Sequence, residues 1–233
     1  MVWFFPIAFS ACTINSFWCT IAFWATESAG KTGTIVLLFI SCIFYTIRVE
    51  SKRKKIKNFF ASFIVLGVLL SSIAYLNEHV TKELVGIPRP SHLFIIKNTL
   101  PKIRIDSIYK INESERKTLL QELIKSDSMA YQYIDIRVQD HWVEEAGYSF
   151  PSGHSFNAFL LSTILGFSLS HSRIKWVRSL FFVPFAWAIL VAVSRVAIGA
   201  HSSLDVSFGA SLGLIIGQIF LYFDYTRGFI TNR

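Results

Sequence analysis

The chain has 233 residues, of which 52% are hydrophobic, and its formal net charge is +8. Its apolar residues form long uncharged blocks, at 1–26, 58–77 and 206–223, instead of recurring with the periodicity of a soluble helix or strand. Each block is long enough to cross the ~30 Å hydrocarbon layer of a bilayer. This pattern excludes an ordinary soluble domain and predicts an integral membrane protein.

We expect one membrane domain over residues 1–233, an all-α protein with six transmembrane helices. The expected spans are 3–24, 32–48, 58–77, 151–171, 177–197 and 204–224. The first block is interpreted as a membrane helix and not as a signal peptide. No basic segment precedes it, and its apolar stretch is longer than a typical signal core.

Positive charge is concentrated between the second and third expected spans. The run consists of Arg48, Lys52, Arg53, Lys54, Lys55 and Lys57. A basic run between apolar blocks indicates topology and contact with anionic lipid, and not binding to nucleic acid. On the opposite side the short links offer only Lys31. The positive-inside rule therefore predicts a multi-pass membrane protein with both termini in the cytoplasm, and the family resemblance given below implies a bacterial inner (plasma) membrane.

The hydrophilic segment 91–147 is expected to form a small helical cap on the extracytoplasmic side, between spans three and four. It holds eight basic and nine acidic residues, so it is nearly neutral. Asn112, followed three residues later by a glutamate, resembles a capping box and predicts an amphipathic helix over 113–126. A second helical stretch is expected over 128–146. The segment is too small for an independent enzyme domain.

Three cysteines, Cys12, Cys19 and Cys42, all fall in apolar blocks. An odd number of cysteines in such surroundings is typical of small buried hydrophobic residues. We expect neither a disulfide nor a cysteine metal site.

The tetrapeptide Pro151-Ser152-Gly153-His154 opens the fourth expected span. Proline suits the first turn of a helix, and glycine lets a ligand approach the backbone. The free N–H groups of a helix start, with the positive end of its dipole, attract anions. Alone the tetrapeptide is a weak signal, because a single histidine at a helix start is more often structural than functional.

His201 and Asp205 are four residues apart at the start of the sixth span. On one helical face, the carboxylate would fix the tautomer of the ring and leave its other nitrogen as a base or nucleophile. An ordinary helix-entry pair is equally compatible with the spacing, but ionisable groups at a membrane span are usually functional. Gly209, Gly213 and Gly217 continue this face and predict close packing of the sixth span against its neighbours.

Three cations, Lys82, Arg89 and Arg195, lie near the ends of apolar spans, and Pro88 and Pro90 restrict the backbone around Arg89. One such residue could be an anchor that snorkels to the membrane surface. The expected topology, however, places all three on the same face as the histidines. Arginine offers a planar fork for phosphate oxygens and lysine a point charge, so we interpret the three as ligands of one anion.

These strings resemble the signature of the type-2 phosphatidic acid phosphatase superfamily. The matching strings are Lys82-x6-Arg89-Pro90, Pro151-Ser152-Gly153-His154 and Ser194-Arg195-x5-His201-x3-Asp205. The resemblance covers the chain from about residue 60 and includes the end of the insert, Trp142-x-x-Glu145-x-Gly147-Tyr148-x-Phe150, which leads into Pro151. Each string is weak alone, and the three together are a specific signal.

The resemblance implies a role for each matched position. His201 would be the nucleophile that forms a phosphohistidine, Asp205 would orient it, and His154 would be the general acid. The phosphate oxygens would be held by Lys82, Arg89, Ser152, Gly153 and Arg195. No metal ion or other cofactor is expected.

The expected function is metal-independent hydrolysis of the terminal phosphate of phosphatidylglycerol phosphate, phosphatidic acid or undecaprenyl diphosphate. The expected partners are this lipid phosphate and the bilayer, with no nucleic acid and no obligate protein partner. A lipid A phosphatase or a lipid phosphotransferase would carry the same residues and differ in substrate or acceptor. A non-enzymatic lipid-binding or transport protein is disfavoured, because transport does not require both histidines and the aspartate at these spacings.

Overall fold

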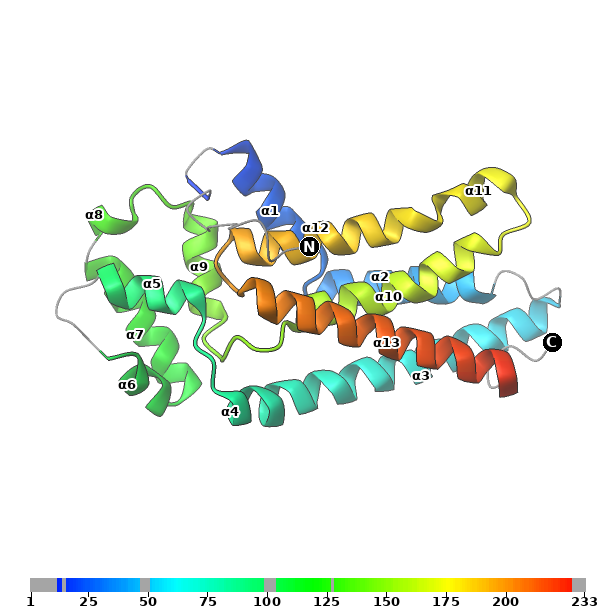
Figure 1. Ribbon diagram of the computed structural model, residues 1–233, viewed down its shortest axis with the longest axis horizontal. Coiled ribbons are helices and arrows are strands. Elements are labelled where there is room, and N and C mark those ends of the chain that lie inside the picture. Colours follow the sequence, from blue (N-terminus) through cyan, green and yellow to red (C-terminus); the bar gives the residue numbers. More distant parts are fainter. Residues whose placement is uncertain (1–11, 14–15, 47–50, 99–103, 127, 228–233) are drawn as a thin grey trace.

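The structure, a computed structural model, describes residues 12–13, 16–46, 51–98, 104–126 and 128–227. These residues are almost entirely helical, with one isolated antiparallel β-bridge between Thr13 and Ile134. The long helices lie along the long axis of the molecule, and the short helices α5 to α9 gather at one end (Figure 1). We call these five helices the end group. The all-α expectation is confirmed for the described residues.

The long helices are α2 (Lys31–Thr46), α3 (Lys52–Leu76), α10 (Gly153–Ser170), α12 (Val183–Ala197) and α13 (Ser203–Arg227), and the shorter α1 (Phe17–Ser28) precedes them. The end group consists of α5 (Pro90–Asn98), α6 (Ile105–Lys110), α7 (Glu113–Ser126), α8 (Ser128–Tyr131) and α9 (Ile136–Glu144). Short helical turns extend two of the long helices. They are the π-helix Asn77–Thr81 with α4 (Lys82–Val85) after α3, and α11 (Lys175–Ser179) with the 3-10 turn Leu180–Phe182 before α12.

The helix α10 forms the centre of the bundle and is buried along most of its length against α2, α12 and α13. Its contact with α13 depends on glycine. A Cβ atom added to Gly209 would come closer than 3.0 Å to the carbonyl oxygen of Ser152, and one added to Gly213 would meet the carbonyl oxygen of Phe156 in the same way. The expected close packing along this glycine face is therefore confirmed, and it fixes the start of α13 against the start of α10.

The third long helix is longer than its sequence predicts. It runs without interruption from Lys52 to Val85, 34 residues, which is roughly 50 Å at the rise of an α-helix. Gly86 ends it in the left-handed conformation, at φ 62°, which favours glycine. The helix therefore extends beyond the expected span 58–77, because the polar residues that follow continue it. Lys82 therefore lies on this helix and not in a loop after it.

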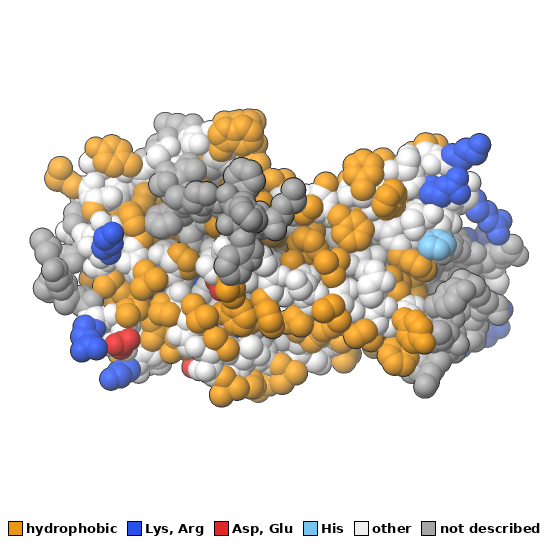
Figure 2. All heavy atoms as spheres, in the orientation of Figure 1, with side chains coloured by type: hydrophobic (Ala, Val, Ile, Leu, Met, Phe, Trp, Pro, Cys, Tyr) orange, Lys and Arg blue, Asp and Glu red, His pale blue; other side chains and the backbone are white. Residues whose placement is uncertain are grey.

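Three helical stretches in the described part of the chain are long and apolar enough to cross a membrane: 52–85, 175–197 and 203–224. The pair α1 and α2, bent by 62°, would be a fourth if counted as one span. Hydrophobic side chains cover much of the bundle in Figure 2, while the Lys and Arg side chains lie toward its two ends. The chain is a membrane protein, but six separate spans are not reproduced.

The expected helix over 3–24 is wrong in its described part, because α1 begins only at Phe17, after the cap residue Ser16. This helix packs mainly against α12 and also contacts α9 of the end group. Thr20 accepts a hydrogen bond from Arg137 of α9 (3.2 Å), and Glu27 lies 3.7 Å from His141 of the same helix. Twelve residues are too few to cross a bilayer, since they span roughly 18 Å. The expected cytoplasmic N-terminus falls on residues outside the described part.

Within the hydrophilic segment, α7 confirms the helix expected over 113–126, and Asn112 Oδ1 accepts a hydrogen bond from the Glu115 N–H at 2.9 Å. The second expected stretch, 128–146, is not one helix. It is broken between α8 and α9, where Asp135 caps α9 by accepting a bond from the Arg137 N–H at 3.0 Å. A side chain that accepts a hydrogen bond from a free backbone N–H at a helix start favours a new helix there over continuation of the preceding one.

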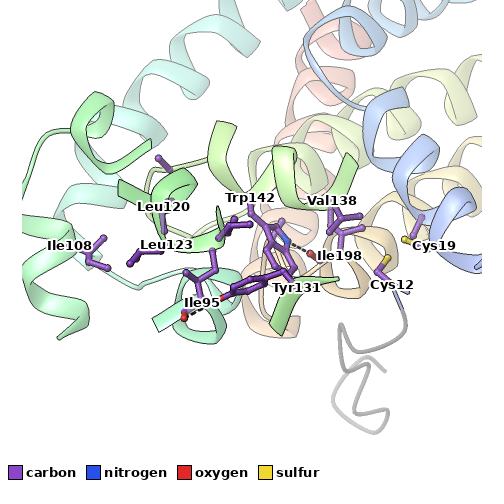
Figure 3. Packing of buried hydrophobic residues seen from close by; sticks show 14 residues of the cluster. Cys12, Cys19, Ile95, Ile108, Leu120, Leu123, Tyr131, Val138, Trp142 and Ile198 are labelled. Atoms are coloured by element: carbon purple, nitrogen blue, oxygen red, sulfur yellow. Dashed lines mark hydrogen bonds between the residues drawn. The ribbon is translucent and has the colours of Figure 1, made fainter. Parts of the chain in front are cut away.

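The end group shares a hydrophobic core with α1 and with the connection between α12 and α13 (Figure 3). Trp142 is fully buried in it, and its indole N–H donates to the carbonyl oxygen of Ile198 at 2.6 Å. Cys12 and Cys19 are buried in the same cluster, so their expected buried placement is confirmed. The bond to Ile198 attaches α9 to the connection between α12 and α13, which carries His201.

The requirement for glycine at the α10–α13 contact can be tested directly. We expect Gly213→Ala to lower the free energy of unfolding by about 1–3 kcal/mol, because the new methyl group would overlap backbone that cannot move aside. Thermal unfolding of the purified protein in detergent measures this. The control is Gly67→Ala in α3, where the added Cβ would meet only the Leu38 side chain at 3.9 Å. Equal stability of the two variants would contradict the packing argument.

Candidate active site

The three sequence strings converge on one cavity of about 1000 Å³ between the bundle and the end group. Seven of the eight predicted site residues line it: Lys82, Arg89, Ser152, Gly153, His154, Arg195 and His201. The eighth, Asp205, is buried and contacts the ring of His201. Helices distant in the sequence thus bring all eight positions together.

The start of α10 forms one wall of the cavity. Ser152 is its N-cap, and the hydroxyl accepts a weak bond from the Ser155 N–H at 3.4 Å. His154 stands in the first turn with 23% of its side chain exposed. A Cβ atom on Gly153 would meet only the Asn77 side chain, at 3.7 Å. Gly153 and His154, whose N–H groups belong to this turn, line the cavity, as an anion site requires.

His201 lies two residues before α13, so the expected placement of His201 and Asp205 on one helical face is wrong. The Nδ1 atom of His201 is 3.4 Å from the Ser149 hydroxyl and 3.6 Å from Asp205 Oδ2. Ser149 donates its own proton to Asp205 Oδ2, so its oxygen is free to accept from Nδ1–H. The carboxylate also accepts from the Ser202 N–H at 2.7 Å. Asp205 thus acts on His201 largely through Ser149.

The other ring nitrogen of His201 faces the cation cluster, with Nε2 3.3 Å from Arg89 Nη1. Because arginine can only donate, Nε2 must be the unprotonated acceptor. Burial lowers the pKa of His201, and the positive charges of Arg89 and Arg195 add to this effect, while Asp205 opposes it. The ring is therefore neutral, with a lone pair on the nitrogen that faces the cavity.

Arg89 is 3% exposed and held by several acceptors. Its Nε donates to the Gly147 carbonyl at 2.9 Å, and its Nη1 donates to the Ala200 carbonyl at 3.0 Å. Nη1 also contacts Glu145 Oε2 at 2.7 Å. These bonds tie the loop after α4 to the segments on either side of the site, so that the guanidinium has a fixed orientation.

Glu145 is the residue that the motifs did not reveal. The same Oε2 atom that contacts Arg89 also accepts from Arg195 Nη2, so one carboxylate bridges both guanidinium groups. Burial disfavours its ionisation, but Arg195 and Arg89 outweigh burial and hold the pKa of Glu145 well below its usual range. Its only sequence signal was its place in the string before Pro151. A permanent anion thus occupies the position where two arginines converge.

Lys82 has a carboxylate of its own. Its Nζ lies 2.7 Å from Oε2 of Glu78, one helical turn earlier, and Lys82 is 7% exposed. Lys82 lines the same cavity as Arg89, Arg195 and Glu145, with its own ion pair to Glu78. In the described part of the chain, no three His, Cys, Asp or Glu residues are grouped as a metal site.

A neutral buried histidine beside fixed cations, at one end of a membrane helix bundle, defines a membrane protein built to handle a phosphate group. The sequence agrees with this class. A sequence model of the PAP2 superfamily matches residues 59–229, which include all eight site positions, and the chain belongs to that superfamily.

Curated relatives extend the match. Phosphatidylglycerophosphatase B of Haemophilus influenzae is 26% identical over 195 residues, covering 83% of this chain and 78% of that protein. The enzyme of that name from Escherichia coli (strain K12) is 26% identical over 191 residues, covering 79% and 68%. The one from Bacillus subtilis is 36% identical over 85 residues, covering 35% and 42%. The chain is therefore a membrane phosphatase of this superfamily.

The protonation state of His201 leads to a first prediction for the site. A lowered pKa means that the neutral ring persists below the ordinary histidine value of about 6.5 and takes up a proton only at more acid pH. We expect the ring carbons of His201 to report a neutral imidazole at about pH 6. NMR titration of the histidine-labelled protein, with His201→Gln for assignment, measures this. Protonation at or above the ordinary value would contradict the arrangement described.

Glu145 leads to a second prediction. Glu145→Gln keeps the shape of the side chain and removes the charge that competes with an anion for Arg89 and Arg195. We expect orthovanadate, a phosphate mimic, to bind about tenfold more tightly to this variant, which corresponds to about 1.4 kcal/mol. Isothermal titration measures the affinity, and Glu144→Gln, an exposed neighbour on α9, is the control. Weaker binding to Glu145→Gln than to the control would show that the carboxylate does not compete.

Proposed function

We propose that the chain is a lipid phosphatase that hydrolyses the terminal phosphate of phosphatidylglycerol phosphate, phosphatidic acid or undecaprenyl diphosphate through a phosphohistidine. The observation that carries this proposal is the placement of His201. Its Nε2 faces Arg89 at 3.3 Å, and its Nδ1 adjoins the pair Ser149–Asp205. A nucleophile aimed at a bound phosphate, with its tautomer fixed from behind, is the arrangement that such chemistry requires.

In the first step, the lone pair of His201 Nε2 forms a bond to phosphorus as the bond to the leaving oxygen breaks, an alcohol oxygen for the two monoesters and a phosphate oxygen for the diphosphate. His154 donates a proton to this leaving oxygen, so its ring must take up that proton when the negatively charged substrate binds. Arg89, Arg195 and Lys82, with the N–H groups at the start of α10, stabilise the charge on the phosphoryl oxygens. Asp205, through Ser149, stabilises the positive charge that His201 acquires.

In the second step, water attacks the phosphohistidine. His154, now unprotonated, takes the proton of this water, and the bond from phosphorus to Nε2 breaks. Orthophosphate leaves, and both histidines return to their initial states. The covalent intermediate divides one difficult displacement into two easier ones. The residues of this chain suffice for every proton transfer, so the proposed mechanism is independent of metal ions.

The cavity supports a lipid substrate. Beyond the charged groups, it is lined by apolar side chains of α3 and α13, including Leu70, Ile73, Phe208 and Leu212. Both helices are among those long and apolar enough to cross a membrane. A phosphate at His201 could therefore remain attached to a tail that lies against these helices within the bilayer.

The positions of the basic segments support an extracytoplasmic site. The start of α3, the link from α10 to α11, and the end of α13 all lie at the end of the molecule opposite the end group (Figure 1). These segments carry the basic residues that normally remain in the cytoplasm. The cavity adjoins the end group, which in this orientation would cap the site on the periplasmic or external face.

The proposal predicts how replacement of each of the two histidines changes the rate of phosphate release. We expect His201→Ala to reduce phosphate release from all three lipids by at least about a thousandfold, because the covalent route is lost. His154→Ala should reduce it by about a hundredfold or more, the usual contribution of a general acid. Release of orthophosphate from purified lipids in detergent, in the presence of a chelator, measures both.

The control is His171→Ala, at the exposed end of α10. Near-wild-type turnover by His201→Ala would refute the nucleophile assignment. Full dependence on added divalent metal would refute the metal-free mechanism. Transfer of the phosphoryl group to a second lipid, in place of release to water, would identify a phosphotransferase, and a preference for lipid A would identify the other alternative.

A further inference from the structure

His141 is a third histidine at the cavity, and it lies outside every string that the sequence singled out. It belongs to α9 of the end group, and 11% of its side chain is exposed. The neighbouring Trp142 anchors α9 to Ile198, and Glu145 follows one turn later. The helix therefore holds His141 rigidly at the edge of the cation cluster.

The ring of His141 contacts Arg195 directly, with Nε2 2.8 Å from Nη1 of the guanidinium. Since arginine has no acceptor, Nε2 must accept this bond and the ring must be neutral, with its proton on Nδ1. Nδ1 lies 3.7 Å from Oε1 of Glu27, which favours that tautomer. Burial lowers the pKa of His141 to about 4; Glu145 opposes this shift, and Arg195 and Arg89 add to it.

The remaining nitrogens of Arg195 have different surroundings. Nη2 donates to Glu145, and Nε is buried with no hydrogen-bond partner among the residues that the structure describes. Nε and Nη2 form the edge of a guanidinium that offers two parallel N–H bonds, which matches two oxygens of one phosphate. Nη1, which His141 binds, is the nitrogen that this edge does not use.

We propose that His141 is a positioning residue that holds Arg195 by Nη1 and thereby presents its Nε–Nη2 edge to the phosphate of the substrate. This inference rests on the proposed function, in which Arg195 binds that phosphate. An unpaired buried N–H is costly, so the guanidinium without His141 would turn toward another acceptor. The bond from Nη1 to His141, added to the bond from Nη2 to Glu145, prevents the guanidinium from rotating before the substrate binds.

The test compares His141→Leu, which removes the acceptor, with His141→Gln, whose amide oxygen can accept from Nη1 in place of Nε2. We expect the leucine variant to raise the KM for a lipid phosphate and the inhibition constant of orthovanadate about tenfold each, with kcat changed less than about threefold. This is the effect of losing one hydrogen bond to a charged group that acts in both the ground and transition states. The glutamine variant should recover most of the affinity.

The control is His171→Leu, at the exposed end of α10 away from the site. Thermal unfolding of each variant identifies loss of the fold, and the glutamine variant keeps the test decisive if the leucine variant does not fold. Wild-type KM and vanadate inhibition in a folded His141→Leu would overturn the inference. So would a glutamine variant that is folded but has lost as much affinity as leucine. If the wild-type protein hydrolyses no lipid phosphate, the proposed function fails instead.

Discussion

Two buried arginines that share one carboxylate are the interaction on which the site depends. Arg89 and Arg195 are 3% and 0% exposed, and both contact Oε2 of Glu145. Isolated guanidinium groups would not remain buried, because the loss of hydration costs several kcal/mol per ion. Glu145 therefore joins the loop after α4, the end of α12 and the end of α9 into one structure. The catalytic geometry is a consequence of this neutralisation.

The rest of the fold supplies the rigidity that this interaction needs. Glycine contacts bring the backbone of α13 against α10, so His201, just before α13, and His154, in the first turn of α10, line one cavity. On the other side, Trp142 binds the carbonyl of Ile198, only three residues before His201. His201 is thus held between the membrane bundle and the end group. In the proposed reaction a small error in its position would reduce the rate substantially, since attack on phosphorus requires alignment.

The sequence predicted the parts of the site that lie in short strings with defined spacing. The tetrapeptide with Ser152 and His154 could be placed at a helix start, although Pro151, expected in the first turn, lies before the cap residue Ser152. Ser149 and His141 could not be predicted, because their roles arise from contacts with residues about 50 positions away. The packing of α1 against α12 was likewise inaccessible, because an apolar segment that contacts another helix has the same composition as one that faces lipid.

Charge accounts for how such a site can be stable when empty and still bind a phosphate. Lys82, Arg89 and Arg195 carry three positive charges, and Glu78 and Glu145 carry two negative charges against them. A phosphate dianion added to this set would leave it net negative, with the ligand close to Glu145. Two like charges about 4 Å apart repel by about 4 kcal/mol at an effective dielectric constant of about 20. The substrate would therefore displace Glu145 from the arginines instead of binding beside it.

Glu145 also has 19% of its side chain exposed toward the cavity, so it has room to move. In the proposed reaction the carboxylate would return when orthophosphate leaves, and the same electrostatics that stabilise the empty site would then favour release of the product.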